Sequence, residues 1–523
     1  MRSPPPHLRT LAAARKPPDW YFRADDAHDT LGTDTTRGGV ISVVTQVIKF
    51  FAQIVTLAIL ARLLSPDDFG KIAMALVLVS ILKMFTGQAL ATGIIQHRNI
   101  SRAQVSGFFW VSAGLCATLA LLASLVSPGM AWFFGEPLLV GIVPAMTLQI
   151  VFAGLSASHL ALLTRSMQFG AISAIDLAAA LLSKVAGVTV AYLGGGYWAL
   201  VLIPVSYDGF RMLLLWVVCT WRPHWTRLTA EAWQLLYFGA KLSATSLIDS
   251  ISAQVDRILI GRFWSPASLG LYTKSYELVH LPGKLINWPL ERVAISALSK
   301  LQDKREDYAA FFTAAVENYL FFMLPPILFL HLASEEVVMI LLGSQWLSAV
   351  PIMRILALVV LLRSLLCPLH WYMVSRSRLK KLMVLNMVTH GLNVAAIVAG
   401  LRWGPLGVST ALVGSAAASL PFAFHYAFAG TAYGVKDYLR TTWRIALSIC
   451  VTGVAVTALR AVLLTGMLST VLAVTSVGLL TGGIYLACML LTPGGHTVMV
   501  VAIETMTEMV RPAKNVEQGT ETE

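Results

Sequence analysis

The sequence predicts an all-α polytopic membrane protein with about fourteen transmembrane helices, arranged as two six-helix bundles followed by two further helices. Three observations support this fold class. The mean hydropathy is +0.71. Only 13% of the residues are charged, whereas soluble domains have about 25%. A nine-residue motif recurs at a fixed offset of 200 residues. Since the polar stretches between apolar segments are short, the sequence predicts no soluble catalytic domain.

Each predicted helix is an apolar stretch of roughly 20 residues, the length that crosses the hydrocarbon core of a bilayer. The seventh and eighth stretches contain the most polar residues. The fourteen stretches are 40–61, 69–92, 104–127, 137–161, 170–193, 197–219, 236–260, 268–290, 310–332, 349–373, 381–401, 405–428, 442–463 and 467–491.

These helices divide the chain into six segments. The predicted order is a disordered cytoplasmic tail (1–37), the first bundle (38–220), a cytoplasmic linker (221–237), the second bundle (238–430), two additional helices (431–495) and a second cytoplasmic tail (496–523). The first tail lacks the apolar core of a secretory signal.

The recurring motif supports the division into two bundles. Residues 62–70 (RLLSPDDFG) and 262–270 (RFWSPASLG) share four identical positions. In both copies a serine precedes a proline, as at a helix N-cap followed by the first helical residue, and the final glycine permits close helix contact. We interpret the shared residues as a structural turn: Arg62, Ser65, Pro66, Gly70, Arg262, Ser265, Pro266 and Gly270. Asp68 is placed to complete a capping box.

The formal net charge of +12 reflects membrane topology and does not indicate nucleic-acid binding. Sixteen Lys and Arg residues of the interior loops fall on one side of the predicted topology. Five fall on the other side: Arg62, Lys71, Arg262, Arg402 and Arg460. Because cytoplasmic loops carry the basic excess, both termini are predicted to be cytoplasmic.

No cofactor or metal site is predicted. The five cysteines lie in apolar stretches without a CxxC pair, and the chain has no GxxxxGK[ST] loop for ATP. The sequence therefore indicates a protein that is not an enzyme.

Polar residues with helical spacing run through three predicted helices. The first helix carries Thr45, Lys49, Gln53 and Thr56; the seventh carries Lys241, Thr245, Asp249, Ser252 and Asp256; the eighth carries Lys274, Glu277, His280, Lys284, Asn287 and Glu291. The second helix contributes Lys83. Because a charge facing lipid costs at least ~2.5–3.5 kcal/mol, these residues are predicted to line a water-filled cavity between the bundles.

Alternatives stay open for several of these residues. Lys49 and Asp249 are equivalent at the offset of 200 and could form a purely structural ion pair. The part of the eighth stretch from Lys284 onward could be a cytoplasmic helix. We expect Asp208 and Arg211, at i and i+3, to neutralise each other. Arg363, His370 and His390 are candidates to line the second bundle, Asp176 and Lys184 share a face of the fifth helix, and Trp198, Trp371 and Tyr372 are candidates for stacking on sugar rings.

The six-plus-six-plus-two plan, with the sequences ARLLSPDDFG (61–70), DRILIGR (256–262), LGLY (269–272) and ALSKLQD (297–303), resembles the multidrug/oligosaccharidyl-lipid/polysaccharide exporter superfamily. Within it, residues 38–430 are most similar to Wzx-type polysaccharide flippases. The resemblance implies a substrate of undecaprenyl-pyrophosphate-linked oligosaccharide, a location in the bacterial inner membrane, and partnership with polysaccharide polymerase or export machinery.

On this interpretation Lys49, Lys83, Lys241 and Lys274 neutralise the diphosphate, and Asp249, Asp256 and Glu277 couple transport to an ion. Two alternative functions are a multidrug exporter of the same superfamily, which would need few cavity cations, and a polysaccharide ligase or polymerase, which would need a larger external loop.

Overall fold

The computed structural model describes residues 31–85, 94, 100–226, 251–431, 433–463 and 470–510. Over these ranges the regular structure is helical, without strands. Ten stretches in them are long and apolar enough to span a membrane. The predicted fold class is thereby confirmed, while the number of fourteen spans stays a prediction. One of the ten stretches, Leu379–Phe428, comprises two helices.

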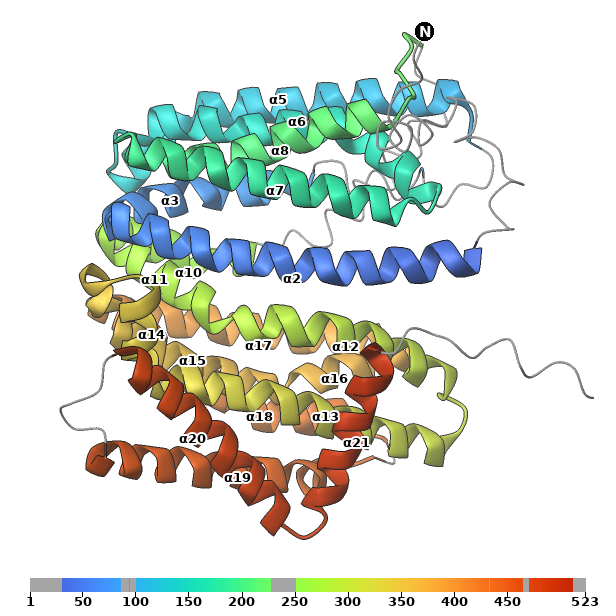
Figure 1. The fold of residues 1–523 in the computed structure, drawn as a ribbon, viewed down its shortest axis with the longest axis vertical. Coiled ribbons are helices and arrows are strands. Elements are labelled where there is room, and N and C mark those ends of the chain that lie inside the picture. The colour runs from blue at the N-terminus through green and yellow to red at the C-terminus, as the bar shows by residue number, and fades with distance from the viewer. Residues whose placement is uncertain are drawn as a thin grey trace, which may run out of the picture. The chain divides into compact units, whose positions relative to one another are not determined.

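The chain divides into two compact units, Met1–Gln254 and Val255–Glu523. The described helices of unit 1 are α2 (Leu31–Leu63), α3 (Pro66–Lys83), α5 (Arg102–Phe134), α6 (Leu139–Arg165), α7 (Phe169–Tyr192) and α8 (Trp198–Val218). They overlap the six spans predicted for the first bundle. In this unit α5 packs against α6, and α7 packs against both α8 and α2 (Figure 1).

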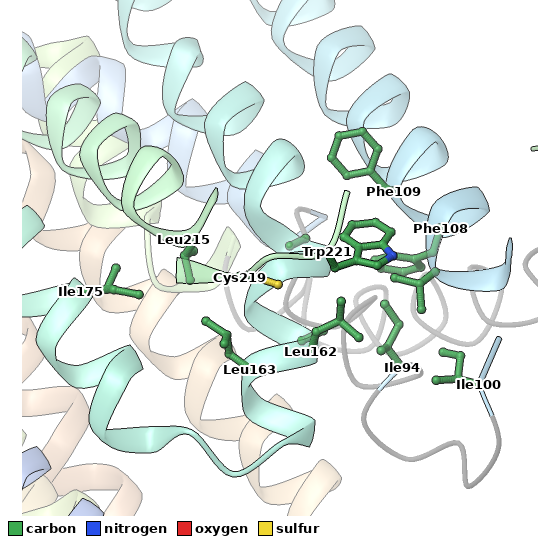
Figure 2. Close-up of a cluster of buried hydrophobic side chains, with 13 residues drawn as sticks. Ile94, Ile100, Phe108, Phe109, Leu162, Leu163, Ile175, Leu215, Cys219 and Trp221 are labelled. Carbon is green, nitrogen blue, oxygen red and sulfur yellow. The ribbon is translucent and has the colours of Figure 1, made fainter. Parts of the chain in front are cut away.

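An apolar cluster joins the start of α5, the end of α6 and the end of α8 (Figure 2). Trp221, three residues beyond α8, is 1% exposed and lies in this cluster. The segment after α8 is also fixed by a hydrogen bond, in which the backbone N–H of His224 donates to Ser106 Oγ at 3.2 Å. Apolar packing and this bond together hold the segment that follows the sixth helix.

Unit 2 contains a larger number of shorter helices. They are α10 (Val255–Phe263), α11 (Pro266–Val279), α12 (Leu281–Lys300), α13 (Arg305–Leu332), α14 (Ser334–Leu341), the 3₁₀ turn η2 (Ser344–Ala349), α15 (Val350–Ser364), α16 (Cys367–Ser375), α17 (Leu379–Gly400), the 3₁₀ turn η3 (Leu401–Trp403), α18 (Gly404–Phe428), α19 (Val435–Leu463), α20 (Thr470–Leu491) and α21 (Gly495–Val510). The last of these lies in the segment predicted as a tail and packs against α13 and α20.

Two predicted spans of unit 2 are each divided into two helices. The eighth breaks at His280, between α11 and α12, and the tenth breaks between α15 and α16. Pro282 and Pro368 lie in the first turns of the helices that follow. Proline lacks a backbone N–H and is therefore tolerated in the first turn of a helix, where no bond within the helix is lost, but not in the interior. Helix α12 is therefore separate from α11, while the alternative of a cytoplasmic helix from Lys284 onward stays a prediction.

The two units share a helix-ending turn that side-chain identity does not reveal. Met167 after α6 and Ser377 after α16 have φ of 56° and 55°, in the left-handed region. In both turns the N–H of the following residue bonds to the carbonyl five residues earlier, at 3.0 Å for Gln168 and 2.8 Å for Arg378. Met167 corresponds to Ser377, and Gln168 to Arg378, at an offset of 210. The same Schellman-type ending thus supports the internal repeat.

Candidate functional site

The repeated Ser-Pro turns begin α3 and α11. Ser65 Oγ accepts the N–H of Asp68 at 3.2 Å, and Asp68 Oδ2 accepts the N–H of Ser65 at 3.0 Å, which confirms the predicted capping box. Ser265 Oγ accepts the N–H of Ser268 at 3.2 Å. The glycines at the end of both motifs are buried, while Arg62 and Arg262 end the preceding helices as exposed side chains.

Two ion pairs among the described residues of unit 1 both involve α8. Lys83 on α3 binds Asp208 through Nζ and Oδ2 at 2.7 Å. Arg211, one turn further along α8, binds Asp176 on α7 through Nε and Oδ1 at 2.7 Å. The prediction that Asp208 and Arg211 neutralise each other is therefore wrong, because each side chain reaches a neighbouring helix instead.

Two further lysines of unit 1 lie on neighbouring helices. Lys49 on α2 and Lys184 on α7 are half-buried on helices that pack together, where two positive charges repel each other. Among the described residues neither lysine has a carboxylate partner. We define the unit 1 cluster as Lys49, Lys83, Asp176, Lys184, Asp208 and Arg211, which comprises four cations and two carboxylates.

A second charged cluster lies in unit 2. Lys274 Nζ and Glu277 Oε2 on α11 form an ion pair of 2.7 Å. Glu277 is also within electrostatic range of Lys284 on α12 and Arg257 on α10. The Arg257 guanidinium lies 5.4 Å from the ring centroid of Tyr276. Three helices thus bring cations around one carboxylate.

Arg363 on α15 extends this cluster. Its Nη2 donates to Asn393 Oδ1 on α17 at 2.9 Å, and the same oxygen accepts from Ser415 Oγ on α18 at 2.9 Å. Arg363 is also in electrostatic range of His280, which stacks on Tyr276 with centroids 3.9 Å apart. An amide oxygen fixes the guanidinium without neutralising its charge.

Asp256 is held by hydrogen bonds from neutral donors. The Tyr272 hydroxyl donates to Asp256 Oδ2 at 2.8 Å, and the N–H of Arg257 donates to Oδ1 at 2.8 Å. The carboxylate is 8% exposed, so its contacts tie α10 to α11. The unit 2 cluster is Asp256, Arg257, Lys274, Glu277, Lys284 and Arg363, again four cations and two carboxylates.

The comparisons with known proteins connect this arrangement to a family. Residues 59–351, more than half of the chain, match the family described as "Polysaccharide biosynthesis protein". The chain belongs to this family. Relatives include the lipopolysaccharide biosynthesis protein WzxC of Escherichia coli K12, 25% identical over 73% of this chain and 78% of that protein. Another is the succinoglycan biosynthesis transport protein ExoT of Rhizobium meliloti 1021, 24% identical over 62% and 65%.

Solved structures share the fold of this polysaccharide biosynthesis family member. The inward closed conformation of the lipid II flippase MurJ superposes with a TM-score of 0.70 at 13% identity, over 90% of this chain and 100% of that one. An inward-facing multidrug resistance transporter of the MATE family, in the MOP superfamily, gives 0.57 at 12% identity over 78% and 98%. The resemblance to the exporter superfamily is therefore confirmed at the level of fold.

The structure places some of the predicted site residues and not others. Lys49, Lys83, Lys274, Asp256 and Glu277 lie in the two clusters. Lys241 and Asp249 lie outside the described residues, so their predicted cavity role and the alternative of a Lys49–Asp249 ion pair both stay untested.

The three predicted sugar-stacking residues differ in their exposure. Trp371 and Tyr372 are 0% exposed and pack among other aromatic side chains, so stacking on a sugar is ruled out for both in this conformation. Trp198 is 43% exposed at the start of α8.

Sequence reasoning passed over one cation. Arg257 follows Asp256 directly, and adjacent residues lie about 100° apart around a helix, so it falls outside a stripe drawn through Asp256. A stripe of residues includes only one face of a helix. Arg257 lies beside that face and reaches the cluster because its guanidinium lies against Tyr276 of the next helix. Searching both flanks of the stripe for cations would have found it.

Proposed function

We propose that this protein is a flippase that carries polyprenyl-pyrophosphate-linked oligosaccharide units across the inner membrane of a bacterium during polysaccharide biosynthesis. Family membership, the transport protein among the relatives and the flippase fold support this assignment. An undecaprenyl carrier, cytoplasmic termini and delivery to a polysaccharide polymerase or export machinery are parts of the same proposal. The protein moves the substrate without altering its covalent structure.

The observation that carries the proposal is the pair Lys49 and Lys184. Two ammonium groups that repel each other inside membrane-spanning helices lower stability, and the described residues supply no carboxylate that offsets the repulsion. A diphosphate would accept both charges at once. Within unit 2, the cationic excess of its cluster also suits an anionic ligand, with the Arg363 guanidinium already oriented by Asn393.

In the proposed mechanism the cations take over from water the role of stabilising the anionic head group. The polyprenyl tail stays in the lipid, and the oligosaccharide passes through hydrated space lined by polar side chains. Alternation between two conformations then exposes the head group first to one leaflet and then to the other. Glu277 and Asp249 are the proposed coupling carboxylates. Asp256, held by Tyr272, contributes by fixing α10 against α11.

The test is the fate of the lipid-linked oligosaccharide in cells without the gene. We expect the intermediate to accumulate on the cytoplasmic leaflet while its synthesis continues, and the wild-type gene to restore export. A strain that exports normally, or that fails to make the intermediate, would overturn the proposal. A multidrug exporter would instead change drug sensitivity without changing the polysaccharide.

A further inference from the structure

Helix α13 of unit 2 contains two consecutive prolines, Pro325 and Pro326, in its interior. Proline has no N–H, so Pro325 leaves the carbonyl of Phe321, four residues earlier, without its helical donor. A buried carbonyl without a donor is costly, and a helix without these bonds bends easily. Something else must therefore stabilise α13 at this point.

The missing donor comes from a helix outside the repeat. The hydroxyl of Tyr485 on α20 donates to the Phe321 carbonyl at 3.4 Å. Tyr485 is 2% exposed, and its ring lies against the Phe321 ring with centroids 5.5 Å apart. The side chain thus reaches the carbonyl that the first proline releases.

Helices α19 and α20 also contact α13 on the far side of the prolines. Arg460 on α19 donates to the carbonyl of Leu332, the last residue of α13, and to the carboxylate of Glu336 just beyond it. On α20, a Cβ built on Gly478 would lie 3.4 Å from a ring carbon of Phe329. Before the prolines, Arg444 Nη1 on α19 lies 3.9 Å from Glu317 Oε1 on α13. Helices α19 and α20 therefore both contact α13 on each side of the prolines (Figure 1).

Helices α5 and α6 of unit 1 meet the same problem between themselves. Pro128 in α5 releases the carbonyl of Ser124, and Pro144 in α6 releases that of Val140. The hydroxyl of Ser127 lies 2.7 Å from the first carbonyl and 3.4 Å from the second. The one hydroxyl proton of Ser127 is thus shared between the two released carbonyls, so α5 and α6 meet this need without a further helix.

We propose that α19 and α20 are a brace that fixes the angle of α13 at Pro325–Pro326, so that the three helices move as one body when the transporter changes conformation. This gives a role to the two helices that have no counterpart in the repeat. The role is independent of which substrate is carried.

The test is amide hydrogen exchange of residues 321–332 in the purified full-length protein, compared between the wild type and Tyr485→Phe. Loss of one buried hydrogen bond is expected to speed exchange in α13 about fivefold. Thr475→Val is the matched control, because it removes one exposed hydroxyl of α20 whose hydrogen bonds stay within the helix. Unchanged exchange in Tyr485→Phe, or an equal rise in Thr475→Val, would overturn the brace.

A second pair of variants tests the far side of the prolines. Arg460→Leu removes the cation from the Glu336 carboxylate and the donor from the Leu332 carbonyl, so hydrogen exchange should rise in both α13 and α14. Adding Glu336→Gln removes the buried negative charge. Slow exchange should then return in α14 more than in α13, because the Leu332 carbonyl still lacks its donor. A rise confined to α14 would contradict the brace. Because exchange is measured without substrate, these results do not depend on the proposed flippase activity.

Discussion

Asp208 on α8 pairs with Lys83 on α3 at 2.7 Å, although Arg211 lies one turn away on its own helix. Arg211 in turn pairs with Asp176 on α7. One helix is thus bound to two different neighbours by charges of opposite sign within three residues of each other. In apolar surroundings such pairs fix which helices are adjacent, because an unpaired charge there is costly.

This arrangement predicts strong coupling between Lys83 and Asp208. Lys83→Met and Asp208→Asn should each lower the thermal stability of the purified protein, since each removes one half of the ion pair. The double variant should recover part of the loss, with a coupling energy of about 0.5–3 kcal/mol. Melting curves in detergent measure it, and simple additivity of the two losses would contradict the pairing.

Lys49 and Lys184 should behave in the opposite way. Removing either charge relieves a repulsion, so Lys49→Ala and Lys184→Ala should retain or raise thermal stability while export falls at least tenfold. Stability lost at a binding site in exchange for function is a common trade-off. Lys49→Arg should keep part of the export, because the charge persists while its geometry changes.

The matched control for these variants is Lys304→Ala, which removes a lysine that is 72% exposed in a loop and should leave export unchanged. The contrary outcome is equally specific. If Lys49→Ala alone abolishes export and Lys49→Ala/Asp249→Ala restores it, the lysine is one half of a structural ion pair.

Membrane topology can be checked by labelling single cysteines with an impermeant maleimide in intact cells. Ser127 and Ser334 follow from the sequence as outward positions, but they are 2% and 0% exposed and would react poorly wherever they lie. Ser348 and Ser377 are exposed. We expect labelling of Ser348→Cys in intact cells and of Ser377→Cys only after permeabilisation, with a variant that lacks the five native cysteines as background and blank. The reverse pattern would invert the topology.

The two copies of the Ser-Pro turn should differ in their contribution to stability. Ser65→Ala removes one half of a reciprocal capping box and is expected to cost about 1 kcal/mol of unfolding free energy. Ser265→Ala should cost less, because Ser268 cannot reciprocate as Asp68 does. Thermal denaturation of the two variants side by side measures the difference, and equal losses would show that the carboxylate of Asp68 adds nothing.

The sequence predicts those features that depend on short separations. Apolar stretches of the right length locate the spans, and Ser65 with Asp68 three residues later predicts the capping box that the structure contains. The division of the eighth span is also within reach, since Pro282 follows His280 closely. Each of these signals is complete within a few residues of chain.

Partners distant in the sequence are beyond such reasoning. Lys83 and Asp208 are 125 residues apart, and helical periodicity gives the face on which a charge lies but not the helix that faces it. Proximity along α8 therefore favoured the wrong partner for Asp208. The same limit applies to Tyr485, whose target is a backbone carbonyl 164 residues away that carries no side-chain signal at all.

The left-handed turn shared by Met167 and Ser377 bears on the ancestry of the molecule. Neither methionine nor serine favours this conformation, which usually selects glycine or asparagine. Two independent origins would each have had to accept that cost at the same point of the chain. Descent of both units from one duplicated six-helix gene is the simpler history, in which the path of the backbone was inherited while the side chains along it were replaced.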